Sequence, residues 1–254
     1  MGLELNCSML IAILTDIHGN REALSACLAH ARLLKVDRFI FLGDYVGYGA
    51  DPAWVVDTIR AMVAQGAVAL LGNHDAAIDG SDEDMNGLAR EAIRWTRDQL
   101  GTEQRRFLAG LPLIHEEGNV LYVHANGYAP RNWDYMSGPM EAVHHFSRVE
   151  AHVTFCGHVH VPMLYHMSTT AKVGTFSPVA NNDIPLLPTR TWLAVIGAVG
   201  QPRDGVAAAN YAVFDTARQT LRYLRVPYDT ATAARKVREA GLPEKLALRL
   251  EQGR

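Results

Sequence analysis

Near its N-terminus the chain reads MLIAILTDIHGN from Met9 to Asn20, an apolar run that passes directly into the pair Asp16 and His18. The continuous run Met9–Leu14 predicts a strand that is buried on both faces. Residues two apart in an extended chain point to the same side, so the side chains of Asp16 and His18 face one way. This stretch therefore predicts a sheet whose first strand ends in two potential metal ligands.

The same plan, an apolar run followed by side chains that can bind metal, recurs along the chain. Its further members are Val36–Asp44 ending in Gly43-Asp44, Ala67–His74 ending in Asn73-His74, Leu121–His124, and Val153–His160 ending in Gly157-His158-x-His160. Strands of a sandwich that end together would bring these side chains to one rim. Carboxylate, imidazole and amide ligands suit Mn, Fe, Zn or Ni. Cys156 precedes the last motif, and we interpret it as a buried core residue rather than a ligand.

The composition is typical of a globular chain with moderate charge. It has 254 residues, of which 48% are hydrophobic and 20% charged, with a net charge of −3 and a pI near 6.4. The length suits one domain with a substantial core. The weak negative charge argues against a nucleic-acid polymer or an anionic membrane as partner. Three cysteines without CxxC spacing predict reduced thiols and a cytoplasmic location, and the oligomeric state is left open.

Strand and helix alternate in the first half of the chain, and strands dominate the second half. The predicted helices are Glu22–Leu34, Asp51–Ala64 with Asp51 as N-cap, Gly87–Leu100, Thr102–Leu108, Met140–Val149, and two within Thr230–Gln252 that break at Gly241-Leu242-Pro243. The predicted strands are Met9–Leu14, Arg38–Leu42, Ala67–Leu71, Leu113–Glu116, Val120–His124, Val153–Cys156, Leu164–Met167, Trp192–Gly197, Tyr211–Asp215 and Thr220–Val226, the last with the alternation of a half-exposed edge strand. This order predicts two sheets with outer helices.

We predict a single domain over residues 1–254, because no linker or repeat divides the chain. Residues 1–8 are predicted to be an N-terminal extension, and residues 227–254 a helical C-terminal tail. Two segments, Asn126–Gly138 and Phe176–Pro188, are predicted to be irregular and long enough to be functional loops.

Taken together, these motifs resemble those of the calcineurin-like metallophosphoesterase superfamily, from Ile11 to about Val226. Gly19-Asn20 and the segment VGQPRDG at 199–205 are similar to its small bacterial, phosphodiesterase-like branch. The resemblance implies an α/β fold, a four-layer α/β/β/α sandwich. It also implies a dinuclear site that hydrolyses phosphoesters by in-line attack of a metal-bridging hydroxide. The Asp-Arg-Gly motif of the Ser/Thr protein phosphatases does not follow Gly43-Asp44, which argues against that branch.

The resemblance further implies which residues hold the two metal ions, each of them Mn, Fe, Zn or Ni. The first ion takes Asp16, His18, Asp44 and His160, and the second takes Asp44, Asn73, His124 and His158. Asp44 lies midway in the order of the motifs and has two oxygens, so it is the predicted bridge. His74 is predicted to be catalytic together with Asp44, contacting the phosphate and protonating the leaving oxygen. Asp75 would either orient His74 or cap the following turn.

Substrate contacts are predicted on the loops at this rim. The candidates are Asn73, His74, Tyr48, Arg131 and Arg203. Arg131 offers a fork for phosphate, while the neighbouring Trp133 and Tyr135 either stack on a base or pack the loop down. Arg203 either faces the phosphate or pairs with Asp204.

These interpretations predict a hydrolase of small phosphomonoesters or phosphodiesters. A dinucleoside polyphosphate hydrolase of the diadenosine-tetraphosphate type is the alternative, with the aromatic loop holding adenine. A non-catalytic metal-binding scaffold is a remote alternative, because His74 and all seven ligand positions are present. The expected partner is a small phosphoester substrate rather than a nucleic acid or a membrane.

Overall fold

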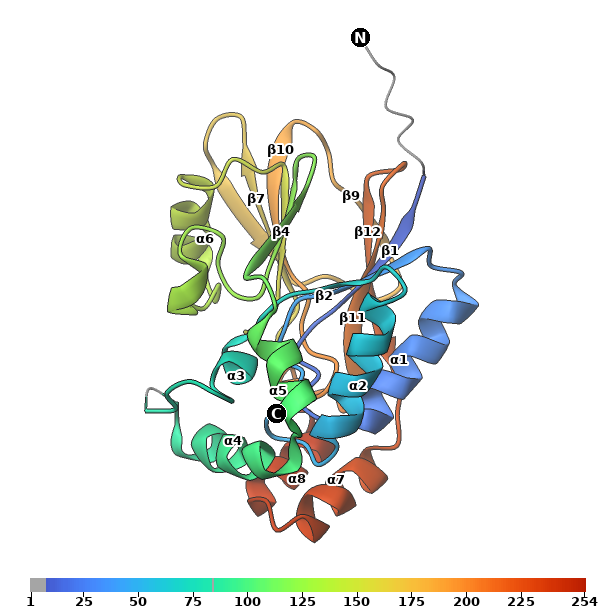
Figure 1. The fold of residues 1–254 in the computed structure, drawn as a ribbon. Helices are drawn as coiled ribbons and strands as arrows, with labels where there is room; N and C mark the ends of the chain where they lie inside the picture. Colours follow the sequence, from blue (N-terminus) through green and yellow to red (C-terminus); the bar gives the residue numbers. More distant parts are fainter. Residues whose placement is uncertain (1–7, 84) are drawn as a thin grey trace.

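The computed structural model describes residues 8–83 and 85–254, which form two stacked sheets with helices outside them (Figure 1). The predicted N-terminal extension lies outside the described residues apart from Ser8, which is exposed. Along the described residues, no helix combines the length and the apolar character that crossing a membrane requires.

The first sheet has the strand order β3-β2-β1-β11-β12-β9. Its strands are β1 (Leu10–Leu14), β2 (Arg38–Phe41), β3 (Val68–Ala69), β9 (Asp183–Pro185), β11 (Ala209–Asp215) and β12 (Thr220–Val226). The strands β1, β2 and β3 run parallel, and β11 pairs antiparallel with β1. The carboxyl ends of the three parallel strands therefore meet at one edge.

The second sheet has the strand order β4-β5-β6-β10-β7-β8. Its strands are β4 (Ile114–Glu117), β5 (Val120–Val123), β6 (Val153–Cys156), β7 (Met163–Ser168), β8 (Val173–Phe176) and β10 (Arg190–Val195). Because β5, β6 and β10 are parallel to one another, their carboxyl ends also meet at one edge. The predicted hairpin around Gly118 is confirmed, since β4 and β5 pair antiparallel across it.

Three helices form the outer layers. The helices α1 (Arg21–Leu33) and α2 (Pro52–Val63) cover the outer face of the first sheet, and α6 (Pro139–Phe146) lies outside the second sheet (Figure 1). Asn20 starts α1 by accepting a hydrogen bond from the backbone N–H of Ala23 at 3.0 Å. The predicted four-layer α/β/β/α architecture is confirmed.

The strand β1 is buried on both faces, as its continuous apolar run predicts. Ile11 and Ile13 lie in the core between the sheets, where they share a cluster with Phe155 of the second sheet. Ala12 and Leu14 face the opposite way, into the cluster beneath α1 and α2. This alternation follows from the two-residue period of a strand.

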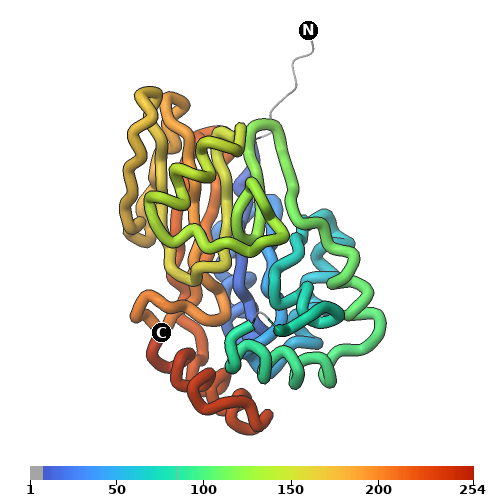
Figure 2. The backbone as a smooth tube through the Cα atoms, turned by 90° about the vertical axis from the view of Figure 1, so that its left-hand side faces the viewer, coloured from blue at the N-terminus to red at the C-terminus, as the bar shows by residue number. Residues whose placement is uncertain are grey.

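The remaining helices gather near one end of the sheets. They are α3 (Asn73–Ala76), α4 (Gly87–Gln99), α5 (Thr102–Ala109), the short 3₁₀ helix η1 (Pro130–Asn132), α7 (Thr230–Glu239) and α8 (Glu244–Gln252). Figure 2 shows α7 and α8, in red, at the same end of the molecule as α4. Leu246 and Leu250 of α8 share an apolar cluster with Ala92 of α4 and with Tyr48. The helices of the predicted C-terminal tail are therefore packed onto the body of the domain.

The structure corrects the prediction that Thr220–Val226 is an edge strand. The short strand β9 pairs with β12 on its outer side, from Asp183 opposite Arg222 to Pro185 opposite Thr220. The same strand, together with the end of β8, lies in the segment Phe176–Pro188 that we predicted to be irregular. A strand of three residues that ends in proline carries too little alternation to be detected in the sequence.

Two predicted elements differ in detail. The strand β3 spans Val68–Ala69 rather than Ala67–Leu71, because Leu71 donates its N–H to Pro112 instead of to a strand. Asp51 does occupy the N-cap of α2, but its carboxylate binds Lys236 Nζ at 2.8 Å instead of a backbone N–H of the helix. The cap residue therefore joins α2 to α7.

Candidate metal centre

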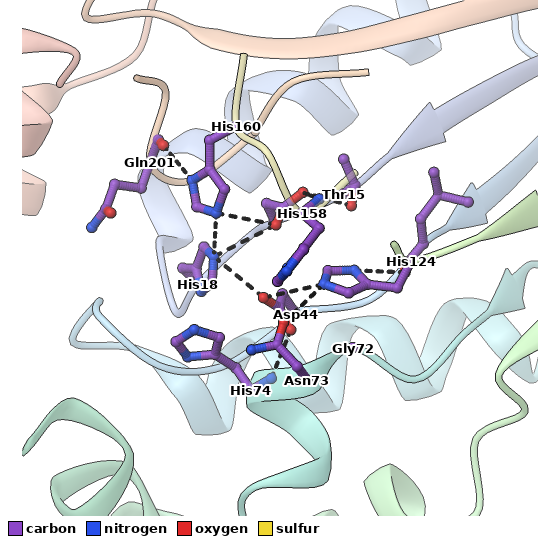
Figure 3. Close-up of polar contacts among 12 residues, drawn as sticks. Thr15, His18, Asp44, Gly72, Asn73, His74, His124, His158, His160 and Gln201 are labelled. Carbon is purple, nitrogen blue, oxygen red and sulfur yellow. Dashed lines mark hydrogen bonds and ion pairs between the residues drawn. The ribbon is translucent and has the colours of Figure 1, made fainter. Parts of the chain in front are cut away.

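The candidate ligands follow strands whose carboxyl ends meet at the same end of the two sheets. Asp16 and His18 follow β1, Asp44 follows β2, Asn73 and His74 begin α3, His124 follows β5, and His158 and His160 follow β6. Figure 3 shows seven of these side chains converging on one volume: His18, Asp44, Asn73, His74, His124, His158 and His160. The expectation that one rim would collect them is thereby confirmed.

The side chains fall into groups of potential ligands, one around Asp16 and one around Asp44. In the first, His160 Nε2 lies 3.2 Å from Asp16 Oδ1, and His18 Nε2 lies 3.1 Å from His160 Nε2. In the second, His124 Nε2 lies 3.4 Å from Asp44 Oδ2, and His158 belongs to the same group.

Asn73 and His74 also border these groups. Asn73 Oδ1 lies 3.1 Å from His124 Nε2, as a ligand of the same ion would. Asp44 Oδ2 is 3.7 Å from His18 Nε2 and thus links the two groups. His74 lies near enough to Asp44 and His18 to form a further group of three.

Hydrogen bonds to backbone carbonyls set the tautomers of three imidazoles. The Nδ1 atoms of His18, His124 and His160 lie 3.0, 3.1 and 2.7 Å from the carbonyl oxygens of Val46, Leu42 and Gln201. A carbonyl oxygen can only accept, so each Nδ1 carries a proton, and in the neutral form of each ring Nε2 presents a lone pair. Two such lone pairs, on His18 and His160, face each other at 3.1 Å. A cation between them removes this repulsion.

Asp16 points one free oxygen at the same place. Its Oδ2 accepts hydrogen bonds from the hydroxyl of Thr15 and the backbone N–H of His158. Among the described residues its Oδ1 is buried without a hydrogen-bond donor. A buried carboxylate oxygen is costly to leave unpaired. The donor set therefore fits a divalent cation.

The two carboxyl groups are held in the ionised form. Burial alone would raise the pKa of Asp44, but the charge and the hydrogen bond of neighbouring His124 hold it well below its ordinary value. Asp16 follows the same pattern. Burial raises its pKa, but neighbouring His160 outweighs burial, so the net pKa of Asp16 is below its ordinary value. Ionised carboxylates are the form that binds metal.

Burial keeps most of the imidazoles neutral. It lowers the pKa of His18, brings that of His74 to about 4, and brings that of His158 to about 3. Burial also lowers the pKa of His124, but the charge of Asp44 outweighs it and raises the value to about 9. A bound cation competes for the proton on His124, so metal binding weakens as the pH falls.

The backbone at the site is held in an uncommon conformation. Asp16, His18, Asp44, His158 and His160 have φ angles between 49° and 65°, in the left-handed region. Asp and His tolerate this region better than most residues, yet each such residue costs on the order of 1 kcal/mol or more. Close packing holds these turns in place, since a Cβ on Gly43 would lie 2.6 Å from the nitrogen of Gly72.

A family model described as the calcineurin-like phosphoesterase superfamily domain matches residues 9–219. The chain belongs to this superfamily. It is a metal-dependent phosphoesterase, and the expectation drawn from its motifs is confirmed.

Three proteins are similar to this phosphoesterase over nearly its whole length. An uncharacterised protein of Methanocaldococcus jannaschii is 34% identical over 96% of this chain and 98% of its own. A metallophosphoesterase of Sphaerobacter thermophilus, known from its crystal structure, is 35% identical with a TM-score of 0.85, covering 98% of this chain and 100% of its own. A hypothetical protein of Pyrococcus horikoshii, also solved, is 20% identical with a TM-score of 0.78, covering 96% of this chain and 98% of its own, and shares the fold.

In this phosphoesterase, Asp75 binds the backbone of the ligand loop rather than His74. Its carboxylate accepts N–H groups of Asp44 at 2.7 Å, Tyr45 at 2.9 Å and Gly72 at 3.0 Å. The bond to Gly72 caps the start of α3, the turn that contains Asp75, and not the following turn as predicted. The other role, orienting His74, is not seen, because His74 Nδ1 has no hydrogen-bond partner among the described residues.

His74 instead lies beside aromatic rings at the edge of the ligands. Its ring centroid is 4.8 Å from that of His18 and 4.6 Å from that of Tyr48. A Cβ on Gly47 would lie 2.4 Å from His74 Nδ1, so glycine leaves room for this ring. His74 Nδ1 is therefore enclosed beside Gly47, and it makes no hydrogen bond to a described residue.

A cavity of about 420 Å³ opens next to the ligands. It is lined by Tyr48, Asn73, His74, Ala77, Ser81, Met85, Asn86, Ala89, Asn132, Trp133, Tyr135 and His158. Tyr135 stacks on His158 with ring centroids 4.0 Å apart, and Trp133 meets His124 edge-on at 5.9 Å. The lining includes Tyr48, Asn73 and His74 but not Arg131, which is exposed on the same loop as Trp133.

Arg203 does not pair with Asp204, contrary to one of the two predicted roles. Asp204 instead forms an ion pair with Arg225 of β12. The guanidinium of Arg203 lies over the ring of Tyr48, with Cζ 5.7 Å from the ring centroid, and donates to Gln201 Oε1 at 2.9 Å. Sequence reasoning overlooked Gln201 as a site residue, although it lies in the quoted VGQPRDG segment.

Proposed function

We propose that this phosphoesterase is a dinuclear, metal-dependent hydrolase of small phosphomonoesters or phosphodiesters. The observation that carries the proposal is the shared position of Asp44, whose Oδ2 lies 3.7 Å from His18 Nε2 and 3.4 Å from His124 Nε2. A carboxylate between two sets of imidazoles is well placed to bridge two cations. Asp44 Oδ1 also accepts the N–H of His74 at 2.8 Å, which fixes the orientation of the carboxylate.

In this proposal the chain holds its metals through the residues implied by the family resemblance. Asp16, His18, Asp44 and His160 hold one ion, and Asp44, Asn73, His124 and His158 hold the other. Two bound ions, each Mn, Fe, Zn or Ni, supply an activated water and neutralise charge on the phosphoryl oxygens. Asn73 contributes a neutral amide oxygen, which limits the negative charge that an anionic substrate meets.

His74 serves the substrate in this mechanism. Its ring lines the cavity and is neutral in the free protein, with a pKa of about 4. A phosphate dianion beside the ring raises that pKa, because the negative charge favours the imidazolium. His74 can then donate a proton to the leaving oxygen, a step that contributes roughly 10²–10⁴-fold to the rate of such reactions.

A dinucleoside polyphosphate hydrolase is the second candidate. The cavity beside the ligands favours it, because Trp133 and Tyr135 present aromatic rings in its lining and Ala77 and Met85 add apolar surface. Such a wall suits a nucleobase on the leaving group.

The test is turnover by the metal-supplemented protein of a chromogenic monoester, a chromogenic diester and diadenosine tetraphosphate, side by side. Hydrolysis of at least one, with two metal equivalents per chain by elemental analysis, is the expected result. A preference for the tetraphosphate selects the second candidate. Absence of turnover on all three, with Mn, Fe, Zn and Ni each supplied, would refute the proposal.

A further inference from the structure

Two arginine side chains from distant parts of the chain meet at one amide oxygen beside the metal centre. Gln201 Oε1 accepts from Arg203 Nη2 at 2.9 Å and from Arg249 Nη1 at 3.3 Å. Arg203 follows β10 in the VGQPRDG segment, whereas Arg249 lies in α8. The family model ends at residue 219, so it does not cover Arg249.

The donors of this cluster exceed its acceptors. Among the ion pairs of the described residues, neither Arg203 nor Arg249 has a carboxylate partner, and the nearby Asp204 is paired with Arg225. Arg203 Nε and Gln201 Nε2 are buried, and in the described chain neither has an acceptor. Gln201 as a residue is only 1% exposed. Buried donors without acceptors are costly, and an anion would satisfy several of them together.

The two guanidinium groups also oppose each other. Burial and the charge of Arg203 hold the pKa of Arg249 below its ordinary value. Two cations that share a neutral amide oxygen repel, and an anion between them turns that repulsion into attraction.

The cluster adjoins the first group of metal ligands. The backbone carbonyl of Gln201 accepts from His160 Nδ1 at 2.7 Å, and the backbone N–H of Arg203 donates to the carbonyl of His160. Arg203 also lies over Tyr48, which is 4.6 Å from His18 between ring centroids and lines the substrate cavity. Tyr48 therefore links Arg203 to the first ligand group and to the substrate cavity, and Arg249 meets Arg203 at Gln201 Oε1.

We propose that Arg203, Arg249 and the amide of Gln201 bind a second anionic group of the substrate, such as a phosphate next to the one that is hydrolysed. This inference rests on the proposed function and narrows it, because the subsite favours esters with two or more phosphates over simple monoesters. The C-terminal helix α8 thus contributes to substrate selection as well as to packing.

The test compares Arg249→Gln with Lys245→Gln, which removes an exposed positive charge from the same helix. For each variant, kcat/KM is measured on diadenosine tetraphosphate and on a chromogenic monoester. Arg249→Gln should lower the value for the tetraphosphate by roughly 10- to 100-fold more than for the monoester, as expected for the loss of charged hydrogen bonds. Lys245→Gln should change kcat/KM by the same factor for both substrates. Equal losses on both substrates with Arg249→Gln, together with a lower Tm, would mean that Arg249 only braces α8 and would overturn the proposal.

Binding of inorganic anions separates this inference from the proposed function. Isothermal titration of the metal-loaded protein, at fixed free metal, gives Kd for orthophosphate and for pyrophosphate. Arg249→Gln and Arg203→Gln should each raise the Kd for pyrophosphate by roughly 10-fold or more relative to the Kd for orthophosphate. An unchanged ratio in both variants refutes the subsite even if the enzyme is active. A changed ratio supports the subsite even if none of the three test esters is hydrolysed.

Discussion

The carboxylate of Asp75 accepts a hydrogen bond from the backbone N–H of Asp44, with 2.7 Å between Asp75 Oδ2 and the nitrogen. The same carboxylate accepts the N–H groups of Tyr45 and Gly72. One buried side chain therefore holds together the two loops that carry Asp44 and Asn73. The positions of those ligands depend on a residue that touches neither metal nor substrate in the proposed site.

Replacing Asp75 by Ala should destabilise the protein by about 2–4 kcal/mol, because several buried N–H groups lose their hydrogen-bond acceptor. Asp75→Asn keeps one carbonyl oxygen in place and should cost less. Chemical denaturation gives the free energy of unfolding, and elemental analysis gives the metal content. Retention of wild-type stability by Asp75→Ala would show that water replaces the carboxylate at these N–H groups.

Asp44→Asn should remove metal and activity together, because the amide is a poor bridge between two cations. Elemental analysis and turnover of the chromogenic esters check this. Asp79→Asn, on the exposed surface, serves as the control for losing one carboxylate. Two full metal equivalents still bound to Asp44→Asn would exclude Asp44 as the bridge.

His74→Ala should keep the metal content while lowering turnover by roughly 10²-fold or more. The reason is that His74 lines the cavity next to the ligands and is proposed to serve the leaving oxygen. The exposed His144→Ala is the matched control. Loss of one metal equivalent in His74→Ala would show that His74 is a metal ligand. Unchanged turnover would show that His74 has no catalytic role.

Trp133→Ala should raise KM for diadenosine tetraphosphate by roughly 5- to 150-fold, since stacking on a base is worth about 1–3 kcal/mol. Arg131→Ala on the same loop tests the predicted phosphate fork. Because Arg131 is exposed and outside the cavity lining, we expect its effect on KM to be the smaller of the two. Steady-state kinetics on monoester and tetraphosphate measure both effects on KM. A larger effect of Arg131→Ala would mean that the charge of Arg131 contributes more to substrate binding than the ring of Trp133.

His145 should make the protein acid-sensitive independently of the metal centre. Burial lowers its pKa from 6.5 to about 4, and its Nε2 lies 3.0 Å from the hydroxyl oxygen of Thr154. Between these two pH values the unfolded chain binds the extra proton, so stability is complete above pH 6.5 and falls as the pH drops toward 4.

The loss from His145 reaches on the order of 3 kcal/mol at pH 4 and about 2 kcal/mol at pH 5. His145→Gln does not titrate, so its stability should change less between pH 7 and pH 5 than that of the wild type. Denaturation of the metal-free protein at both pH values measures the difference, with His144→Gln as control. Identical pH dependence in wild type and His145→Gln would mean that His145 is protonated within the native state.

The ligand rim could be predicted from the sequence because each ligand motif directly follows a short apolar run, and such a run indicates a strand from neighbouring residues alone. Strands β6 and β12 match their predicted bounds, and α1 is shifted by one residue. The strand β9 was missed because three residues show no period. The contact between Gln201 and Arg249 joins positions 48 apart, and Asp75 acts on a loop 30 residues earlier. Such contacts depend on how helices and loops pack against one another, and a local sequence pattern does not predict that packing.

The left-handed backbone at five ligand positions has a consequence for laboratory evolution. Glycine at any of these positions would relieve conformational cost in the metal-free chain while deleting a ligand. A screen that rewards heat resistance under chelating conditions is therefore expected to enrich variants that have discarded the catalytic centre. The same screen with saturating metal should retain it, since binding energy then outweighs the relief.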